Sequence, residues 1–392
     1  CIIFMMKKIL IIHTRYTETG GEDIAVDNEI QFLGQNYQVE TLVFQNTLKP
    51  NLLDLLAFIR NNNRDSVNKL QNSIAEFRPQ YVYIHNLWFK GSLGILKYLI
   101  KNNINVTIKL HNFRYYCTKS YKSSRHLDKN GDCYACGLSV DQVGYFNKYY
   151  TNSFLKSVLV NHFGKKYFKL LNSEKIKIVT LTNHHRNFLI ELGINKKNIF
   201  IQPNPIPQLK NFKYKSKDKL NQVVYAGRIS KEKGIEELIK AWVKLTRKNY
   251  SLLIIGDGPY FEEINKIVRQ TQGISLLGYL SNEKVLKIIS ESKAVVTSTK
   301  LYEGQPTLLC EASALGIVSV FPDSGGIKEF FESDYQYSFR QFDYVDLQNK
   351  LQKIINNNNL DFDGFESRKY ILKYLDEQKL LSNFETIFEE RR

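Results

Sequence analysis

The chain has 392 residues, enough for two domains of ordinary size, and 43% of them are hydrophobic, which excludes a largely disordered protein. No stretch approaches the roughly 20 apolar residues of a membrane-spanning helix. The chain opens on an apolar segment too short for a signal peptide and contains five cysteines. We therefore expect reduced thiols and a cytoplasmic protein.

Short apolar strands alternate with helical segments along the whole chain, which predicts parallel α/β sheets. In the first half, the expected strands lie at residues 8–13, 40–44, 81–85, 105–110 and 177–182. In the second half, they lie at residues 222–226, 251–255, 274–277, 294–298 and 317–321. Three prolines within residues 202–207 forbid a continuous helix or central strand, so we expect a hinge there. The segment from Glu366 to the end has helical spacing.

Positive charge is concentrated in the first half of the chain. Residues 1–205 contain 27 basic and 14 acidic residues, whereas the remainder contains 28 and 25. The excess lies mainly between Lys90 and Arg186, where aromatic residues are interleaved with it. It fits either a solvated surface or a face attracted to an anionic membrane. We expect no nucleic-acid partner, because no recognition motif accompanies the charge.

Three cysteines form a separate pattern. Cys117, Cys133 and Cys136 have the spacing Cys-x15-Cys-x2-Cys. Structural zinc normally has four ligands, and the fourth would have to be His126 or His162. The pattern favours free thiols in a loop, with a structural zinc site as the alternative.

The segment from Glu303 to Glu311, Glu-Gly-Gln-Pro-Thr-Leu-Leu-Cys-Glu, places two carboxylates eight residues apart. Residues 294–299 have the pattern of a buried strand, Pro306 suits the first position of a helix, and Gly316 would end that helix. The first N–H groups of a helix are available to bind anions. Two acids beside such a site suit a ligand with a diphosphate and several hydroxyls, such as a nucleotide sugar.

Two further segments complete the pattern. Residues 222–242 indicate a strand, a glycine turn, a basic loop and an amphipathic helix, and residues 251–258 indicate a strand that enters another glycine turn. Together with the paired glutamates, this order resembles the C-terminal domain of family 4 glycosyltransferases, which are retaining enzymes of the GT-B fold. The resemblance covers residues 223–330. It implies two Rossmann-like domains facing a cleft, with a last helix that packs back toward the first domain.

The expected domains are an acceptor-binding domain at residues 1–205, a nucleotide-sugar-binding domain at residues 206–370, and the returning helix at residues 371–392. The resemblance also implies residue roles. Arg228 and Lys233 would clamp the donor diphosphate, Glu311 would hold the ribose hydroxyls, and Glu303 would hold those of the donor sugar. His111, after the strand at 105–110, would contact the donor sugar and complete the catalytic set. The other implied donor contacts are Gly20, Gly21, Gly227, Gly304, Gln305, Pro306, Thr307 and Leu308.

These expectations describe a retaining glycosyltransferase that needs no metal ion, because Arg228, Lys233 and helix termini would balance the diphosphate charge. It would move a sugar from a nucleotide sugar to a saccharide or lipid-linked acceptor in bacterial surface polysaccharide synthesis. We expect a UDP-sugar first and GDP-mannose second. The basic first half would allow peripheral contact with the inner face of an anionic membrane. The alternatives are a GT-B epimerase or phosphorylase, and a non-catalytic membrane-binding protein.

Overall fold

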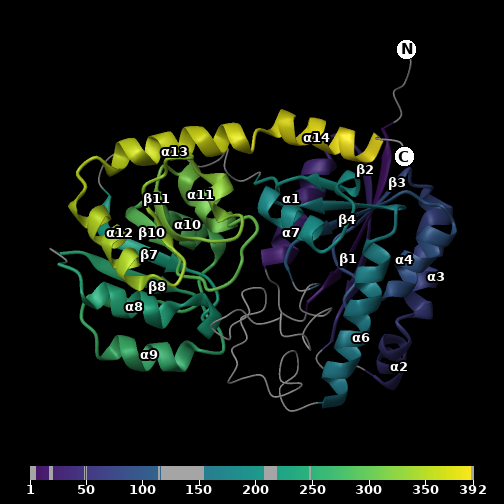
Figure 1. Ribbon diagram of the computed structural model, residues 1–392, viewed down its shortest axis with the longest axis horizontal. Coiled ribbons are helices and arrows are strands. Elements are labelled where there is room, and N and C mark those ends of the chain that lie inside the picture. The colour runs from purple at the N-terminus through teal and green to yellow at the C-terminus, as the bar shows by residue number, and fades with distance from the viewer. Residues whose placement is uncertain are drawn as a thin grey trace. The chain divides into compact units, whose positions relative to one another are not determined.

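The computed structural model describes residues 6–16, 21–47, 49, 51–113, 115, 154–206, 219–246 and 249–389. The chain divides into two compact units. Unit 1 comprises Cys1–Pro207 and Glu377–Arg392, and unit 2 comprises Gln208–Asp376. Each unit contains a six-stranded sheet in which every pair of neighbouring strands is parallel (Figure 1). The predicted parallel α/β architecture is therefore confirmed.

Unit 1 has the strand order β2-β1-β3-β4-β5-β6. Its strands are β1 (Lys8–Arg15), β2 (Gln38–Gln45), β3 (Tyr81–Ile84), β4 (Val106–Leu110), β5 (Ile176–Thr180) and β6 (Ile199–Ile201). Its helices are α1 (Gly21–Leu33), α2 (Leu52–Arg60), α3 (Arg64–Phe77), α4 (Leu93–Lys101), α6 (Phe154–Leu171), α7 (Asn183–Glu191), the 3-10 helix η2 (Lys196–Asn198) and α14 (Glu377–Glu389).

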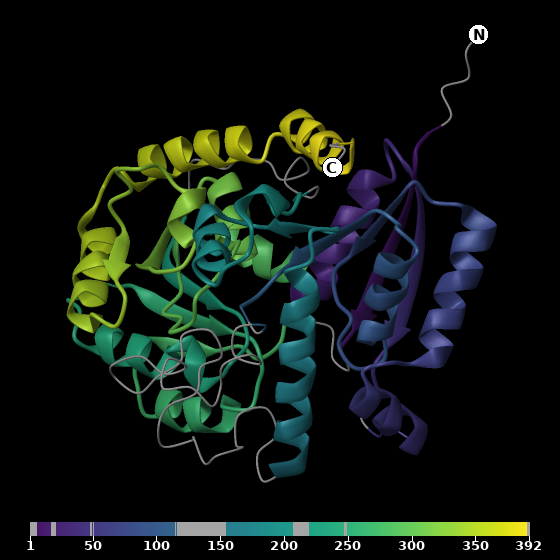
Figure 2. The same ribbon diagram turned by 45° about the vertical axis from the view of Figure 1, so that its right-hand side comes forward.

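The two faces of this sheet are covered by different helices, because successive side chains of a strand point to opposite faces. Leu10 and Ile12 of β1 belong to a core shared with α3, α4 and α6. Ile9 and Ile11 belong to a second core shared with α1 and α14. Both covering layers can be followed in Figures 1 and 2. Burial on both faces explains why these strands are almost continuously apolar.

Helix α14 completes the second core with aromatic side chains. The ring of Phe388 stacks on Tyr81 at 5.2 Å, and the ring of Phe384 lies 6.1 Å from Phe32. Near the C-terminal end of α14, the ammonium of Lys177 donates to the carbonyl of Ile387 at 2.5 Å. The helical segment predicted from Glu366 onward is therefore two helices in two units, since α13 ends at Tyr374 and α14 begins at Glu377.

Unit 2 has the strand order β12-β11-β10-β7-β8-β9. Its strands are β7 (Leu220–Ala226), β8 (Ser251–Ile255), β9 (Ile274–Leu276), β10 (Ser292–Val296), β11 (Val318–Asp323) and β12 (Ser338–Arg340). Its helices are α8 (Ile235–Val243), α9 (Phe261–Arg269), α10 (Asn282–Ser290), α11 (Thr307–Ala314), α12 (Tyr344–Asn356), α13 (Leu360–Tyr374) and the 3-10 helices η4 (Lys231–Lys233) and η5 (Ile327–Phe330). All ten predicted strands are present, within two residues at each end.

In both sheets, the first strand lies inside the sheet. Strand β1 has β2 on one side and β3 on the other, and β7 has β8 on one side and β10 on the other. The chain therefore leaves the first strand in one direction and later returns to its other side. At such a switch point, the connections after the two strands lead to opposite sides of the sheet, and the opening outside the carboxyl ends of the strands is where ligands bind in open α/β sheets.

In the described ranges, no helix is both long enough and apolar enough to cross a bilayer.

A charged pair lies in the interior of unit 1. The ammonium of Lys109 in β4 donates to Glu29 Oε1 in α1 at 2.7 Å, and both side chains are fully buried. The hydroxyl of Tyr83 donates to the same oxygen at 3.3 Å. Burial raises the pKa of Glu29 and lowers that of Lys109, while their mutual attraction opposes both shifts. Each charge is tolerated there because the other is present.

Removing one member of this pair should destabilise unit 1 strongly. We expect Lys109→Met to cost about 3–5 kcal/mol in free energy of unfolding, because it leaves Glu29 buried without a counter-charge. Glu29 must then be protonated when folded, so its folded pKa lies above its unfolded pKa. The cost should therefore be small below the unfolded pKa and grow as the pH rises. Urea unfolding at pH 5 and pH 8 measures both effects.

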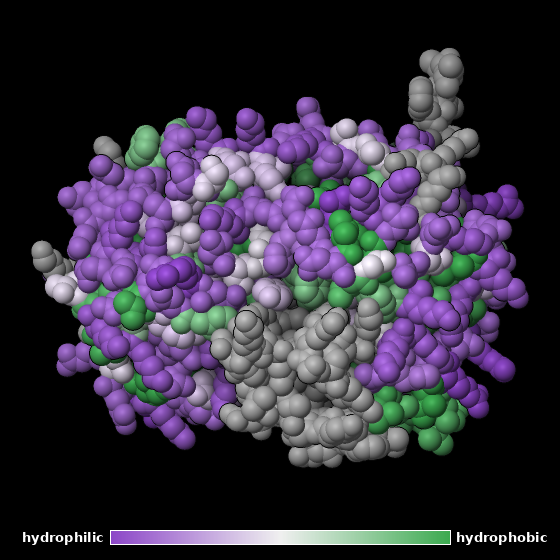
Figure 3. Space-filling view, viewed as in Figure 1, coloured by the Kyte–Doolittle hydropathy of each residue, from purple (hydrophilic) through white to green (hydrophobic). Residues whose placement is uncertain are grey.

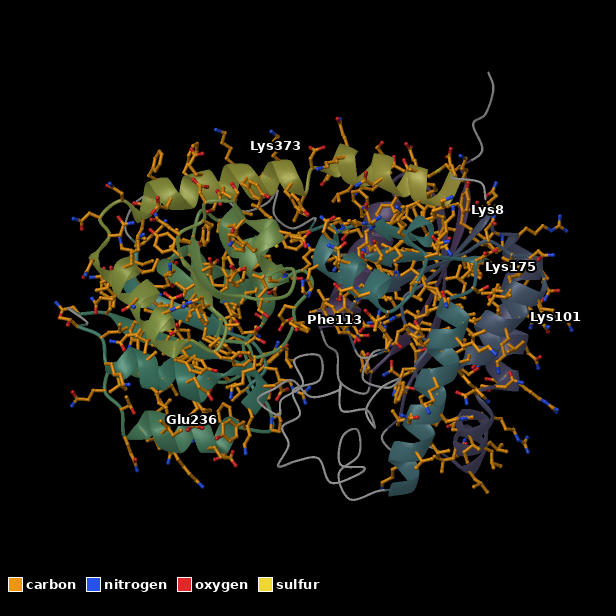
Figure 4. All side chains as sticks on the ribbon, viewed as in Figure 1. Lys8, Lys101, Phe113, Lys175, Glu236 and Lys373 are labelled. Atoms are coloured by element: carbon orange, nitrogen blue, oxygen red, sulfur yellow. The ribbon has the colours of Figure 1, made fainter. Side chains whose placement is uncertain are left out.

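Lys101→Met is the matched control, because Lys101 lies exposed in the last turn of α4 (Figure 4). It should change stability by less than about 0.5 kcal/mol. Equal effects of the two substitutions would show that the buried pair contributes nothing.

Candidate functional site

The two loops at the switch point of unit 2 are joined by hydrogen bonds. One loop follows β7 and the other follows β10. The hydroxyl of Ser298 donates to the carbonyl of Lys233 at 3.1 Å and to that of Gly234 at 2.8 Å. The N–H of Lys300 donates to the carbonyl of Glu232 at 2.9 Å. The predicted residues Lys233 and Glu303 are thus held on one structure, although 70 residues separate them in the chain.

Lys233 and Glu303 form an ion pair across these loops. The ammonium of Lys233 donates to Glu303 Oε1 at 2.5 Å, and the two side chains are 27% and 29% exposed. The hydroxyl of Thr299 donates to the same oxygen at 3.2 Å. Because both side chains remain accessible, the pair presents a cation and a carboxylate to solvent at one point.

Gly234 allows the two loops to approach this closely. It has a φ of 66°, a left-handed conformation that favours glycine. A Cβ at this position would lie 2.2 Å from the carbonyl oxygen of Ser298. Gly234 also precedes α8 and ends η4, so it fixes where the chain carrying Lys233 turns into a helix.

A third loop supports Glu303 from the other side. The N–H of Gly326, after β11, donates to the carbonyl of Glu303 at 2.9 Å. Gly325 lies close enough that a Cβ on it would be 2.6 Å from that carbonyl oxygen. The position of Glu303 is therefore set by loops from two neighbouring strands of the sheet, β10 and β11.

Helix α11 begins three residues after Gly304. Pro306 was predicted to be its first residue, and this was wrong: with a ψ of 81°, Pro306 is the cap, and Thr307 is the first helical residue. No side chain of the described residues makes a hydrogen bond that caps the start of this helix. Its first N–H groups have no acceptor within the helix and point away from its N-terminal end, where they can donate to a ligand. Gly304 and Gln305 are buried, and Thr307 and Leu308 are half-buried.

Glu311 lies in the interior of α11 and is 5% exposed. Burial raises the pKa of its carboxyl to about 7, and a hydrogen bond from Asn282 at the start of α10 opposes the shift. The carboxyl is therefore poised between its neutral and ionised forms near neutral pH. It is an acceptor whose strength depends on what binds next to it.

Gly227 and Arg228 follow β7 directly. The N–H of Gly227 donates to the carbonyl of Ile255 at 3.0 Å, and a Cβ on Gly256 would lie 1.9 Å from the carbonyl oxygen of Gly227. The hydroxyl of Tyr225 donates to the carbonyl of Arg228 at 3.0 Å. The backbone here is therefore fixed, but the side chain of Arg228 is exposed and has no ion-pair partner among the described residues.

In unit 1, the predicted residue His111 follows β4. Its Nε2 lies 2.9 Å from Nδ1 of His85, which follows β3, and the two rings stack at 5.2 Å. Burial, then the charge of Lys109, holds the pKa of His111 well below its usual value, so the ring is neutral. Two residues further along the chain, Phe113, labelled in Figure 4, packs on the ring of His185 in α7, with 4.2 Å between the ring centroids.

His85 connects His111 to the buried pair. Its Nε2 faces Glu29 Oε2 at 3.7 Å, and Glu29 also binds Lys109. A proton on Nε2 of His85 is favoured by that carboxylate, which leaves its Nδ1 to accept from His111. His111 would then keep an unprotonated Nδ1, able to accept a hydrogen bond from a hydroxyl.

Gly21 is the first residue of α1. The start of α1 is less suited to an anion than the start of α11, which Gly304 and Gln305 precede. The first turn of α1 already carries Glu22 and Asp23, acids that suit a helix N-terminus and repel another anion. Asp23 is itself bound to His13 at 2.8 Å. Gly20 lies outside the described residues, as do Cys117, Cys133 and Cys136.

Thr299 and Asn282 were not predicted as site residues, although they bind Glu303 and Glu311. Both are small polar residues at the ends of expected elements, a position too common in proteins to single them out. His85 follows the expected strand at 81–85, but its contact with Glu29 depends on which strands are neighbours in the sheet.

Comparison with known proteins identifies unit 2. A family model described as "Glycosyl transferases group 1" matches residues 208–375, nearly the whole unit. Unit 2 is a group 1 glycosyltransferase domain. The Lys233–Glu303 pair, Arg228 and the start of α11 therefore lie within a glycosyltransferase domain.

Curated relatives are similar over parts of their length. An uncharacterized glycosyltransferase of Methanocaldococcus jannaschii is 25% identical over 249 residues, covering 60% of this chain and 63% of the relative. The amylovoran biosynthesis glycosyltransferase AmsD of Erwinia amylovora is 27% identical over 164 residues, 40% of this chain and 46% of the relative. The matches thus span less than two thirds of these relatives.

Solved structures match almost the whole chain. The lipopolysaccharide outer core galactosyltransferase WaaB is 18% identical with a TM-score of 0.64, covering 97% of this chain and 98% of that one. The Anabaena protein HepE, solved with UDP and glucose, is 13% identical with a TM-score of 0.66, covering 96% and 98%. These likenesses show the fold, which is the GT-B fold that the sequence resemblance implied.

The close approach of the two loops in the glycosyltransferase domain can be tested at Gly234. Gly234→Ala should destabilise the protein by at least about 1 kcal/mol more than Gly278→Ala. Both glycines have a left-handed φ, 66° and 72°, but a Cβ on Gly278 would meet nothing within 4 Å. The difference in urea unfolding therefore isolates the contact with Ser298. Equal destabilisation would mean that the loop after β10 yields without cost.

Proposed function

We propose that the protein is a retaining glycosyltransferase of family 4, which moves a sugar from a nucleotide-sugar donor to a saccharide or lipid-linked acceptor. The observation that carries this proposal is the arrangement at the switch point of unit 2. There, the Lys233–Glu303 pair, the exposed cation of Arg228 and the uncapped start of α11 come from loops that hydrogen bonds and two close glycine contacts hold together. This arrangement combines cations and N–H groups that can bind an anion with a carboxylate that can bind hydroxyls.

The donor diphosphate would lie before α11. Its oxygens would accept from the N–H groups of Thr307 and Leu308 and be neutralised by Arg228 and Lys233. The ammonium of Lys233 has three donors, so it can keep Glu303 and still bind a phosphate oxygen. As the nucleoside diphosphate leaves, negative charge grows on these oxygens. Fixed donors aimed at that charge stabilise the transition state more than the ground state.

Glu303 would orient the sugar. Its Oε1 is engaged by Lys233 and Thr299. The second carboxylate oxygen would accept from hydroxyls of the donor sugar. Glu311 would accept from the ribose hydroxyls in its ionised form, together with Asn282. Gly227, Gly304, Gln305 and Pro306 would shape the loop that surrounds the diphosphate.

His111 would contact the donor sugar as a neutral ring. In the tautomer favoured by His85 and Glu29, its Nδ1 accepts a hydroxyl hydrogen. A neutral ring suits an oxocarbenium-like transition state, because a nearby imidazolium would repel the positive charge that develops at the anomeric carbon.

Retention of configuration would follow a front-face route. A double displacement needs a carboxylate nucleophile on the far face of the anomeric carbon. The identified carboxylates have other tasks: Glu303 is paired with Lys233, and Glu311 is assigned to the ribose. The leaving phosphate would instead assist deprotonation of the acceptor. In this scheme Arg228, Lys233 and α11 balance the diphosphate charge, so no metal ion is required.

A UDP-sugar is the first choice of donor, and GDP-mannose is the second. HepE, which has the same fold, has been solved with UDP-glucose. The relative AmsD, named for amylovoran biosynthesis, supports an acceptor in bacterial surface polysaccharide synthesis. We propose a cytoplasmic protein that touches the inner face of the membrane through its basic first half. None of these relatives favours an epimerase or a phosphorylase.

The diphosphate clamp predicts a loss of turnover. Arg228→Ala or Lys233→Ala should lower the transfer rate on the order of 10²-fold, comparable to losing a fixed donor at a developing charge. Lys231→Ala is the matched control, because Lys231 lies in the same loop but over the ring of Tyr260, at 5.3 Å. Transfer is measured as nucleoside diphosphate released in the presence of acceptor. Wild-type turnover in the Arg228 and Lys233 variants would exclude the clamp.

The two glutamates should separate sugar from nucleotide binding. Glu303→Gln should impair transfer but leave UDP affinity nearly unchanged, whereas Glu311→Gln should weaken UDP binding itself. Because burial raises the pKa of Glu311 to about 7, wild-type affinity should fall as the pH drops below 7. The terminal phosphate of UDP titrates in the same pH range. The quantity to follow is therefore the difference in UDP affinity between wild type and Glu311→Gln at each pH.

Affinity is measured by thermal shift, since a ligand that binds the native state raises apparent stability. The same assay with GDP, ADP and CDP identifies the base. The role of Glu311 would be overturned if the difference in UDP affinity between wild type and Glu311→Gln did not change with pH. Both roles would be overturned if Glu303→Gln weakened UDP binding and Glu311→Gln did not.

A further inference from the structure

Helix α2 of unit 1 exposes an unusual amount of aliphatic surface. It has nine residues, and five of the large hydrophobic side chains that the structure leaves exposed belong to it. Their exposed fractions range from 38% to 75%: Leu52, Leu53, Leu55, Leu56 and Ile59. In the space-filling view, an apolar patch lies where Figure 1 places α2, at the lower right (Figure 3).

These side chains form one stripe. Positions 52, 55, 56 and 59 have the spacing of one helix face, and Leu53 lies beside it. The opposite face is anchored by Phe58, whose ring lies 5.4 Å from Trp88 and 5.5 Å from Phe163. A surface helix usually presents polar residues on its outward face. Helix α2 differs, because it presents aliphatic residues there in addition to the aromatic anchor on its inward face.

The helix is complete without a partner on the stripe. Asn51 caps its start by accepting from the N–H of Asp54 at 2.7 Å. Asn61 ends it in a left-handed conformation, with its N–H bound to the carbonyls of Ala57 and Phe58. A binding partner would therefore find the stripe preformed and would not have to order it.

Cations flank both ends of α2. Near its start, the ammonium of Lys90 lies 3.7 Å from Asp54. Near its end, the ammonium of Lys97 reaches the carbonyl of Asn61 at 3.5 Å. Lys97 belongs to a basic cluster with Lys165 and Lys166 of α6. Burial and then the charge of Lys166 lower the pKa of Lys97. Burial and then the charges of Lys166, Lys97 and Lys165 lower the pKa of His162.

We propose that α2 is an interfacial helix that inserts its leucine stripe into the surface of an anionic bilayer, with Lys90, Lys97, Lys165 and Lys166 on the headgroups. An aliphatic stripe beside lysines is the pattern of helices that lie in the membrane interface. This rests on the membrane contact of the proposed function and assigns it to a defined apolar element.

Charge argues for a bilayer over a second copy of the chain. The formal net charge is +16, and a two-fold dimer through α2 would bring the same lysine cluster against itself. An anionic surface is attracted by that cluster instead, and each basic residue near such a surface adds about 1 kcal/mol, roughly a fivefold gain in binding.

Co-sedimentation of the full chain with vesicles tests the proposal. Binding is measured to phosphatidylcholine alone and to equal parts of phosphatidylcholine and phosphatidylglycerol. The double variant Leu53→Glu, Leu56→Glu should bind the mixed vesicles at least about tenfold more weakly, because two leucines no longer leave water. Val345→Glu is the control, since Val345 is 67% exposed in α12 of unit 2. Lys165→Glu with Lys166→Glu should also weaken binding and reduce its dependence on salt.

Two further measurements keep the outcome clear. Trp88 touches the anchored face of α2, so brominated lipid should quench its fluorescence in wild type and less in the leucine variant. The thermal shift with UDP should be the same in both proteins, so a failure here is distinct from a failure of the donor site. Unchanged binding by the leucine variant, or no binding by wild type to mixed vesicles, would overturn the proposal. The proposal would also be overturned if light scattering showed a dimer for wild type and a monomer for the leucine variant.

Discussion

The constraint on which the site depends is the position of β7 inside its sheet. Because the chain leaves β7 toward β8 and returns to it through β10, the carboxyl ends of β7 and β10 flank the opening of a switch point. The loops carrying Lys233 and Glu303 meet at that opening. The same order in unit 1 places His13, near the end of β1, beside His85, which follows β3. One topological rule therefore places polar residues in both units.

Pairing Lys233 with Glu303 has a second effect beyond holding the loops. Each charge satisfies the other when no ligand is bound, so neither has to be desolvated alone in the half-buried opening. Arg228 stays exposed to water, where an unpaired guanidinium costs little. The site is thus kept polar by one paired cation and one solvated cation. Under the proposed function, a diphosphate would bind the first beside Glu303 and would dehydrate the second.

Much of the fold could be predicted from the sequence, because strands such as 251–255 are apolar runs between turn signals. Strands β6 and β12 were missed, because β6 is followed directly by the proline-rich segment at 202–207 and β12 contains only one apolar residue, Phe339. The paired glutamates and the basic loop were visible as local motifs. Their contact was not, because it depends on which strands are neighbours. Pro306 shows the limit of local rules: its fixed φ suits the first turn, but its ψ of 81° places the helix start one residue later.

The membership of α14 in unit 1 has a consequence for synthesis on the ribosome. Unit 2 is made of one continuous segment and can fold as soon as that segment has emerged. Unit 1 completes its second core later, although most of it is made first, because Phe384 and Phe388 share that core with Phe32 and Leu33. Until they arrive, Ile9, Ile11 and Tyr83 present an apolar surface to the cell. The first half of the chain therefore carries apolar surface that is exposed to aggregation until translation ends.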